Sequence, residues 1–279
     1  MKLIAVDLDG TLLNHQKQVL ENSRASINRL SAQGVHVVVS SGRCFPEVQR
    51  FVKHTACDDL VICDGGAAIM NRKNGQVLRQ WTLDRDAAVQ AATIGVQHGL
   101  ATFAYVNHKL WINTDDYHNT FGHLPGFLDK NSLDDVMKLV DDLPAALARE
   151  GKDITKVMCW SLDAEQKRQA REQIAKIPNI DFTTSGPDNF EVLTVGAGKG
   201  TALKWLAAHL EIPMEQTAAI GDAENDIDMF RAAQYGIAMG NGADCAKAHA
   251  DFVTGDCETN GIVRAFDWIM QQNKTSGLE

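Results

Sequence analysis

The chain has 279 residues, of which 44% are hydrophobic and 23% are charged, and its formal net charge is −9. This acidic balance argues against nucleic acid or an anionic membrane surface as the main partner, because both are bound through Lys and Arg. No stretch approaches the roughly 20 apolar residues that a membrane span needs. The six cysteines form no Cys-x-x-Cys pair and no spacing typical of a zinc site. Free thiols fit a reducing compartment, so we expect a cytoplasmic protein.

The first part of the chain alternates apolar runs with amphipathic segments. Leu3–Leu8 is predicted to be a short buried strand, and a helix is predicted from Gln18 to Gln33, ended by Gly34. Val35–Val39 and Leu60–Cys63 are two further apolar strands. Strands that alternate with helices in this way indicate a parallel α/β sheet.

The pattern changes near Trp81. A capped helix is predicted from Asp84 to His98, and strands are predicted at Ala101–Val106 and Lys109–Asn113, joined by a turn at Asn107-His108. Residues 114–152 mix polar loop with one or two helices. A strand, a helix and a strand then follow, at Ile154–Ser161, Ala164–Lys176 and Ile180–Thr184. Adjacent antiparallel strands with helices indicate a separate α+β unit.

From Phe190 the first pattern is predicted to resume. The elements expected here are a helix near Lys199–Leu210, strands at Thr217–Ile220 and Gly236–Ala238, and a final helix from Gly261 to Gln272. We therefore expect an α/β core made of residues 1–82 and 188–279, with an α+β domain of residues 83–187 inserted into it.

The end of the first predicted strand carries two acids, in Asp7-Leu8-Asp9-Gly10-Thr11. Residues two apart on an extended backbone project to the same side, so Asp7 and Asp9 would face one site, while Gly10 lets the chain turn. In an α/β sheet, sites form outside the carboxyl ends of the strands. The alternative for a bare Asp-x-Asp pair is two solvated loop acids, which the buried strand before it and the Gly-Thr after it disfavour.

A second acidic cluster, Gly221-Asp222-Ala223-Glu224-Asn225-Asp226, follows another apolar strand. The helix dipole alone could explain Asp226, although not the repetition of acids at a second strand end. Two like charges about 4 Å apart repel by roughly 4 kcal/mol at a surface-like dielectric, so Asp7, Asp9, Asp222 and Asp226 need a counter-charge. Carboxylates, waters and a substrate phosphate are the ligands that magnesium prefers, so we predict Mg²⁺.

Two further segments supply donors or positive charge. Ser41-Gly42-Arg43 ends the second strand with a hydroxyl and a guanidinium, although Ser-Gly is also a common turn. Lys199 lies in a glycine-rich stretch that fails the P-loop pattern, because Lys199 is followed by Gly200. A lysine at a helix start is unfavourable for the dipole, which makes a purely structural role for Lys199 the weaker explanation.

Taken together, these residues resemble the haloacid dehalogenase superfamily of phosphohydrolases, in its Cof-like branch. The resemblance rests on four motifs in order: Asp7–Leu12, Ser41-Gly42-Arg43, Lys199-Gly200 and Gly221–Asp226. It covers nearly the whole chain. It implies a Rossmann-like parallel core with an inserted α+β cap domain, which matches the predicted insertion in kind and position.

The resemblance also implies roles for the two acids of the first motif. Asp7 resembles the nucleophile that forms an aspartyl-phosphate, and Asp9 resembles the general acid that protonates the leaving oxygen and later activates water. Thr11 would hold Asp9. Phosphate-monoester hydrolysis needs acceleration of up to about 10²¹-fold, which no single acid supplies and which a nucleophile, an acid, a cation and a lysine together can.

The remaining motifs would bind phosphate and metal. Ser41 and the catalytic Lys199 would hold the phosphoryl oxygens, with Thr11, Gly42, Arg43 and Asn225 also on the substrate side. Magnesium would be held by Asp7, by Asp9 through its backbone carbonyl, and by Asp222, with Asn225 and Asp226 in support.

The segment Asp64-Gly65-Gly66-Ala67 departs from the Asn-Gly-Ala turn of many relatives, which leaves the contribution of this loop open. The expected activity is hydrolysis of a small phosphorylated metabolite, such as a sugar phosphate, by a monomer or homodimer. The alternatives are a phosphomutase on the same scaffold and a non-catalytic binding protein. In the cap, His108, Trp111, Tyr117, His118 and His123 are candidates for substrate contact on polarity and position alone, and Trp111 better fits packing.

Overall fold

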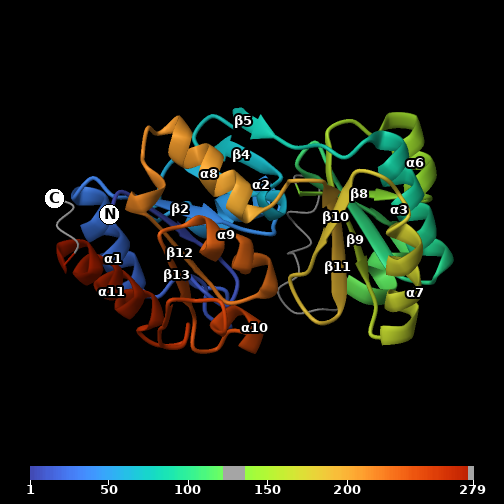
Figure 1. Ribbon diagram of the computed structural model, residues 1–279. Coiled ribbons are helices and arrows are strands. Elements are labelled where there is room, and N and C mark those ends of the chain that lie inside the picture. Colours follow the sequence, from blue (N-terminus) through green and yellow to red (C-terminus); the bar gives the residue numbers. More distant parts are fainter. Residues whose placement is uncertain (122–135, 276–279) are drawn as a thin grey trace. The chain divides into compact units, whose positions relative to one another are not determined.

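The structure is a computed structural model that describes residues 1–121 and 136–275 (Figure 1). Its internal contacts divide the chain into two compact units. The first comprises Met1–Arg43, Val48–Arg79 and Gly198–Glu279, and the second comprises Cys44–Glu47 and Gln80–Ala197. The second unit is thus almost entirely one insertion into the first.

The first unit is built on an eight-stranded sheet in the order β14-β13-β12-β1-β2-β3-β4-β5. All neighbours from β14 to β3 are parallel, whereas β3 and β4 are antiparallel. The strands are β1 Leu3–Val6, β2 His36–Ser40, β3 Leu60–Cys63, β4 Ala68–Asn71, β5 Val77–Gln80, β12 Thr217–Gly221, β13 Tyr235–Ala238 and β14 Phe252–Val253. Every residue of β1 is buried, because strands flank it and helices cover the sheet, which explains its unbroken apolar run.

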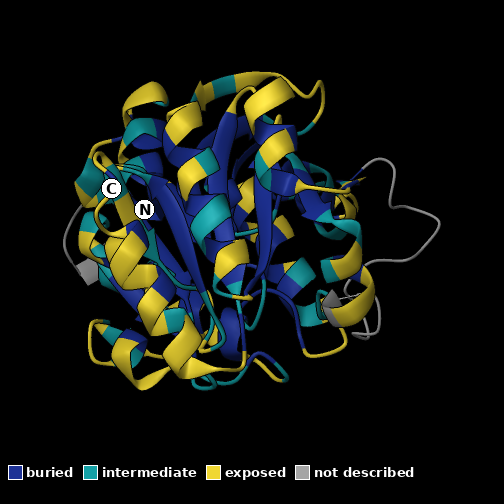
Figure 2. Cartoon of the chain, turned by 90° about the vertical axis from the view of Figure 1, so that its right-hand side faces the viewer, coloured by how far each residue is buried: buried dark blue, intermediate teal, exposed yellow. Residues whose placement is uncertain are grey.

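Helices surround this sheet. Across the chain, Figure 2 shows strands that are largely buried and helices that are exposed on their outer sides. The α-helices are α1 Glu21–Ala32, α2 Phe45–Val52, α8 Lys199–His209, α9 Ile227–Ala232, α10 Asp244–Lys247 and α11 Gly261–Thr275. Single 3₁₀ turns occur at η1 Asp64–Gly66, η4 Met214–Gln216 and η5 Glu224–Asp226. Among the described helices, none combines the length and the apolar character that crossing a bilayer requires.

The second unit is built on a six-stranded sheet in the order β10-β11-β9-β6-β7-β8, antiparallel throughout except for the β7–β8 pair. Its strands are β6 Ala101–Val106, β7 Lys109–Asn113, β8 Met137–Val140, β9 Ile154–Trp160, β10 Ile180–Thr183 and β11 Asn189–Thr194. Its helices are α3 Arg85–Gln97, α4 Thr114–Asp116, the π-helix Tyr117–Phe121, α6 Leu143–Glu150 and α7 Ala164–Ile174.

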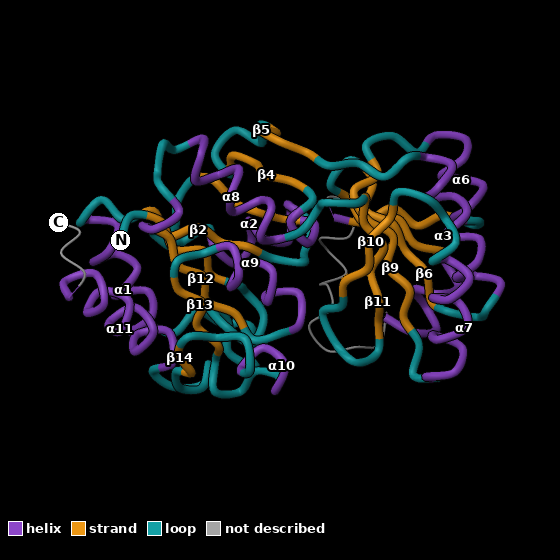
Figure 3. The backbone as a smooth tube through the Cα atoms, viewed as in Figure 1, coloured by secondary structure: helices purple, strands orange, loops and turns teal. Residues whose placement is uncertain are grey.

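One face of the second sheet packs against α3, α6 and α7, which lie together beside it in Figure 3. Each of these helices begins at an aspartate whose carboxylate accepts backbone N–H groups of the first turn: Asp84, Asp142 and Asp163. These caps satisfy donors that the helix itself leaves unpaired, so the local sequence sets where each helix starts.

The predicted fold class is confirmed, while three predicted details differ. β8 lies in a segment for which only loop and helices were expected, because this short edge strand alternates too briefly to be read from sequence. β11 was assigned to the first unit, but it pairs with β9, so the chain returns to the first sheet only at Gly198. β1 ends at Val6 rather than Leu8. His123 lies outside the described residues.

Candidate active site

The carboxyl ends of β1 and β12 lie side by side in the first sheet. Val6 is in register with Ile220, and the N–H of Asp7 donates to the carbonyl of Ile220 at 2.9 Å. The residue that follows each strand is acidic, Asp7 after β1 and Asp222 after β12. The pairing of the two apolar strands therefore brings Asp7 and Asp222 together although they are far apart in sequence. This is the edge at which ligand sites form in parallel α/β sheets.

The turn after β1 wraps around the carboxylate of Asp222. Gly10 has φ +75°, and a Cβ there would lie 2.5 Å from Oδ2 of Asp222, so only glycine fits. The Oγ1 of Thr11 donates to Oδ1 of Asp222 at 3.2 Å. The sequence had placed Thr11 on Asp9; that contact is wrong, because the chain turns at Gly10 and carries Thr11 toward β12 instead.

Lys199 lies between two carboxylates at the start of α8. Its Nζ is 2.7 Å from Oδ1 of Asp7 and 2.5 Å from Oδ1 of Asp226, and its side chain is only 1% exposed. Burial favours the neutral amine, but the charges of Asp226 and Asp7 outweigh it and raise the pKa of Lys199, so the side chain is an ammonium. The unfavourable position of a lysine at a helix start is thus offset by two ion pairs.

Asp226 holds this arrangement together. While Oδ1 binds Lys199, Oδ2 accepts the backbone N–H groups of Asp222 and Ala223 at 2.9 and 3.0 Å. The same carboxylate therefore fixes both the lysine and the loop that carries Asp222.

The carboxylates of Asp7, Asp222 and Asp226 are close enough to share one ion, with ligand oxygens within 4.8 Å of one another. Burial, together with the neighbouring carboxylates, raises the pKa of Asp7 well above its usual range despite Lys199. Burial and Asp226 likewise raise the pKa of Asp222 to about 6. Three acids share one ammonium, so the cluster carries excess negative charge, and its all-oxygen donor set fits a hard divalent cation.

Asp9 points to a different set of partners. Arg43 binds it with two nitrogens, Nε at 2.6 Å from Oδ2 and Nη2 at 2.9 Å from Oδ1, and Lys17 Nζ lies 2.6 Å from Oδ1. Burial alone would raise its pKa, but Arg43 and Lys17 outweigh burial and hold the pKa of Asp9 at about 2. The carboxylate of Asp9 thus has other partners than that of Asp7, which binds Lys199, although the charge of Asp9 still acts on Asp222. That Asp7 and Asp9 face one site stays a prediction.

The Ser41-Gly42-Arg43 loop is supported by the loop after β3. The N–H of Arg43 donates to the Oγ of Ser41 at 3.2 Å, and η1 donates back through Asp64 N to the carbonyl of Arg43 and through Gly65 N to that of Ser41. Gly66, with φ +93°, lies so close to Lys199 that a Cβ would be 2.3 Å from its backbone nitrogen. The loop whose role the sequence left open thus supports both the Ser41–Arg43 loop and the start of α8.

Asn225 is half-buried in η5. Its side chain makes no hydrogen bond with the residues that the structure describes, 1–121 and 136–275. Sequence reasoning missed Asn241 instead. Its Nδ2 donates to the carbonyl of Gly10 at 2.7 Å, and its Oδ1 accepts the N–H of Cys257 at 2.9 Å. Two residues on, the N–H of Ala243 donates to the carbonyl of Asp222 at 2.7 Å. The Asn241–Ala243 segment therefore fastens both acid-bearing turns, and its Gly-Asn-Gly sequence offered no signal beyond that of a turn.

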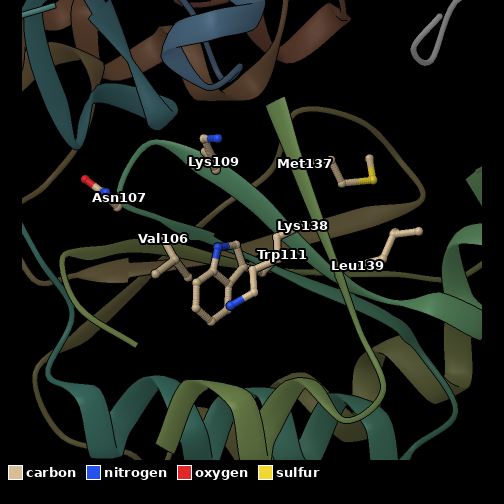
Figure 4. Close-up of a pocket in the computed structure, with 7 residues that line it drawn as sticks. All are labelled: Val106, Asn107, Lys109, Trp111, Met137, Lys138 and Leu139. Atoms are coloured by element: carbon tan, nitrogen blue, oxygen red, sulfur yellow. The ribbon is translucent and has the colours of Figure 1, made fainter. Parts of the chain in front are cut away.

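A pocket of about 600 Å³ lies in the second unit, at the β7–β8 edge of its sheet (Figure 4). It is lined by Val106, Asn107, Lys109, Trp111, Met137, Lys138 and Leu139. The Lys138 ammonium lies 3.9 Å from the centre of the Trp111 ring and 3.0 Å from Glu150. Because no carboxylate lines this pocket, it does not provide the acidic residues of the candidate active site. Trp111 also packs in the core of the second unit.

Comparison with known proteins agrees with this geometry. The sequence model of the haloacid dehalogenase-like hydrolases matches residues 4–266. The 5-amino-6-(5-phospho-D-ribitylamino)uracil phosphatase YcsE of Bacillus subtilis (strain 168) is 27% identical over 271 residues, which cover 97% of this chain and 96% of that protein. The pyridoxal phosphate phosphatase YbhA of Escherichia coli (strain K12) is 28% identical and covers 94% of this chain and 96% of its own length.

The fold is shared with solved structures as well. A haloacid dehalogenase-like hydrolase from B. subtilis superposes with a TM-score of 0.85 at 28% identity, over 96% of this chain and 99% of that one.

Proposed function

Since the chain belongs to the haloacid dehalogenase-like hydrolase family, we propose that it is a magnesium-dependent phosphatase that hydrolyses a small phosphorylated metabolite through an aspartyl-phosphate on Asp7. The observation that carries this proposal is the cluster of Asp7, Asp222 and Asp226 around the buried ammonium of Lys199. Such a cluster combines a carboxylate nucleophile with the positive charge that a transferring phosphoryl group needs.

In the proposed reaction, an oxygen of Asp7 attacks phosphorus and the bond to the ester oxygen breaks. The leaving oxygen takes up a proton, and water then attacks the acyl-phosphate to release inorganic phosphate and restore Asp7. Lys199 stays protonated throughout and stabilises the charge on the phosphoryl oxygens. Its buried position, with 1% of the side chain exposed, excludes water that would otherwise weaken this interaction.

The donor set of the site fits Mg²⁺. Asp7 and Asp222 would hold it through carboxylate oxygens and Asp9 through its backbone carbonyl. Asp226 would support the site without binding the ion directly, because its oxygens already bind Lys199 and two backbone amides. When bound, the cation would neutralise negative charge on the cluster and on the phosphate. Burial and the neighbouring charge of Asp226 raise the pKa of Asp222 to about 6, and both effects disfavour an ionised carboxylate that a bound cation would stabilise, which supports this assignment.

The proposed general acid, Asp9, must first lose its cations. Paired with Arg43 and Lys17 it has a pKa of about 2 and cannot donate a proton near neutral pH. A substrate phosphate dianion competes for both cations, because Arg binds phosphate oxygens as well as carboxylates. We propose that substrate binding draws Arg43 away from Asp9, which raises the pKa of Asp9 and also gives Arg43, Ser41 and Gly42 their place in phosphate binding.

The substrate class rests on the relatives. Those named above act on a phosphorylated ribitylamino-uracil and on pyridoxal phosphate, both small phosphorylated metabolites. We propose the same class here, with sugar phosphates and phosphorylated cofactors as the first compounds to test.

The test is phosphate release from a panel of such metabolites and from a generic aryl phosphate, with and without Mg²⁺. Asp7→Asn should abolish release, and wild-type protein quenched during turnover should carry one phosphoryl group that hydroxylamine removes. The matched control is Glu224→Gln, which changes an exposed acid of the second cluster and should leave the rate unchanged. Isomerised product without free phosphate would instead identify a phosphomutase, and full activity in Asp7→Asn would refute the proposed nucleophile.

A further inference from the structure

Three side chains of different chemistry meet in the first unit outside the acid cluster: His15, Cys257 and Glu258. His15 lies in the turn that follows the Asp7–Leu12 motif. Cys257 and Glu258 lie in the loop between β14 and α11, both labelled in Figure 3. The proposed phosphatase mechanism uses none of the three.

Their ligand atoms are close enough to bind a single ion. An imidazole nitrogen, the Cys257 sulfur and a Glu258 oxygen lie within 4.8 Å of one another. The Nδ1 of His15 is 3.1 Å from Oε1 of Glu258, and the backbone N–H of His15 donates to the same oxygen at 2.5 Å. Cys257 is buried with 4% of its surface exposed, whereas the His15 side chain is 71% exposed. The group therefore combines a shielded thiol with a face open to solvent.

Both loops are held by their own hydrogen bonds. In the His15 turn, Gln18 N donates to Oδ1 of Asn14 at 2.8 Å and Lys17 N to the Asn14 carbonyl at 2.9 Å. In the other loop, Glu258 N donates to Oδ1 of Asp256 at 2.8 Å. Because the backbone on both sides is already fixed, little ordering is needed to bring the three ligand atoms onto one ion.

The chemistry of the three groups sets the kind of ion. Imidazole, thiolate and carboxylate are ligands of zinc and related transition metals, whereas the hard magnesium ion prefers oxygen ligands only. We propose that His15, Cys257 and Glu258 form a binding site for a thiophilic divalent cation, such as Zn²⁺, separate from the carboxylate cluster at Asp7. Binding forms a metal–sulfur bond and releases the thiol proton to solvent, with no change of oxidation state.

This site is joined to the acid-bearing turn by two hydrogen bonds. The N–H of Cys257 donates to Oδ1 of Asn241, and Nδ2 of Asn241 donates to the carbonyl of Gly10. The proposed metal site is therefore two hydrogen bonds away from the turn after β1.

Cobalt gives a direct test, because a cobalt–thiolate bond produces a charge-transfer absorption that oxygen and nitrogen ligands do not. Chelator-treated full-length protein in excess Mg²⁺ is titrated with Co²⁺, and one equivalent should develop this band and lose it when Zn²⁺ is added. Cys257→Ser should abolish the band. The matched control is Cys245→Ser, which changes an exposed thiol elsewhere in the first unit and should leave the band intact.

His15→Ala provides a second variant that leaves the buried thiol in place, since its side chain is largely exposed. It should weaken Co²⁺ binding by more than about 100-fold, beyond the roughly 10–100-fold typical of changes that only contact a metal ligand. A wild-type titration without the thiolate band, or a band that persists in Cys257→Ser, would overturn the proposal.

Discussion

The ammonium of Lys199 lies 2.5 Å from Oδ1 of Asp226, although one begins α8 and the other ends η5. Asp226 simultaneously accepts two backbone N–H groups from the turn that carries Asp222. Lys199 is therefore oriented by a carboxylate that is itself fixed, and its second contact, at 2.7 Å, is with Asp7. The contacts with Asp226 and Asp7 hold the ammonium of Lys199 in one position, although a lysine side chain is normally mobile.

Replacing Lys199 by methionine should lower kcat/KM by at least about 100-fold, the usual effect of removing one group that stabilises a developing oxyanion. It should also destabilise the metal-free protein by about 3–5 kcal/mol, because two buried carboxylates lose their partner. Phosphatase assays and urea unfolding without metal measure the two effects. Lys204→Met changes an exposed lysine on the same helix and should alter neither, while wild-type stability in Lys199→Met would contradict the buried ion pairs.

Mg²⁺ should stabilise the protein more at pH 7 than at pH 5. The pKa of Asp222 is raised from 3.8 to about 6, so between these values the native state binds more protons than the unfolded state. The contribution of Asp222 to stability therefore falls as pH rises through this window, and Mg²⁺, which binds the carboxylate, competes with the proton below pH 6.

Thermal unfolding at several pH values, with and without Mg²⁺, measures this dependence. Asp222→Asn should be more stable than wild type without metal at pH 7 and should lose most of the Mg²⁺ effect. A Mg²⁺ effect that is the same at pH 5 and pH 7, or that survives in Asp222→Asn, would exclude Asp222 as a ligand.

Arg43→Gln should raise the pKa of Asp9 from about 2 toward its ordinary value of 3.8. The pKa rises because the bidentate contact with Arg43 favours the carboxylate form of Asp9 and is lost in the variant. In wild type, the stability that Asp9 contributes is present above about pH 4 and is lost as pH falls toward 2.

The carboxyl resonance of Asp9, assigned with Asp9→Asn, reports this titration directly. Lys17→Gln should shift it less, because Lys17 is 40% exposed and its charge is screened by solvent. Inorganic phosphate should raise the pKa of Asp9 in wild type if the anion draws Arg43 away. A pKa of 3.8 in the unliganded wild type would show that the pairing does not persist in solution.

Much of the fold could be predicted because its signals are local. The buried strands β1 and β3, the capped helix α3 and the strand pair β6–β7 follow from apolar runs, an Asp cap and a turn. The assignment of β11 failed for a different reason: its apolar residues fit either sheet, and only pairing with β9, 29 positions or more away in sequence, decides between them.

The candidate site likewise has residues that could be predicted from local sequence and contacts that could not. Asp7 and Asp222 were predictable, since each follows an apolar strand, and parallel pairing brings their strand ends together. The partner of Thr11 was not, because it depends on how the chain turns at Gly10. Asn241 was missed because its two hydrogen bonds reach backbone atoms, which carry no sequence signal.

Asn241 should matter for turnover although it belongs to neither acidic motif. Its Nδ2 anchors the Gly10 carbonyl between Asp9 and Thr11, and its Oδ1 holds the loop of Cys257. Asn241→Asp keeps the acceptor for Cys257 and replaces the donor to Gly10 with a carboxylate oxygen. A displacement of about 1 Å in a catalytic group can cost roughly 100-fold in rate, so kcat should fall by about 10–100-fold in this variant. KM should change little if the turn acts on chemistry rather than on substrate binding.

The control separates positioning from general loosening of the loop. Asn22 donates from Nδ2 to the Thr259 carbonyl, in the loop that also carries Cys257, and has no hydrogen bond to Gly10. Asn22→Ala should therefore lower the melting temperature by an amount similar to Asn241→Asp, a few degrees for about 1 kcal/mol, while kcat stays near wild type. Equal losses of kcat in both variants would assign the effect to the loop as a whole. An unchanged kcat in Asn241→Asp would show that the Gly10 carbonyl needs no anchor, because the carbonyl would then face a carboxylate without consequence for the turn that carries Asp9.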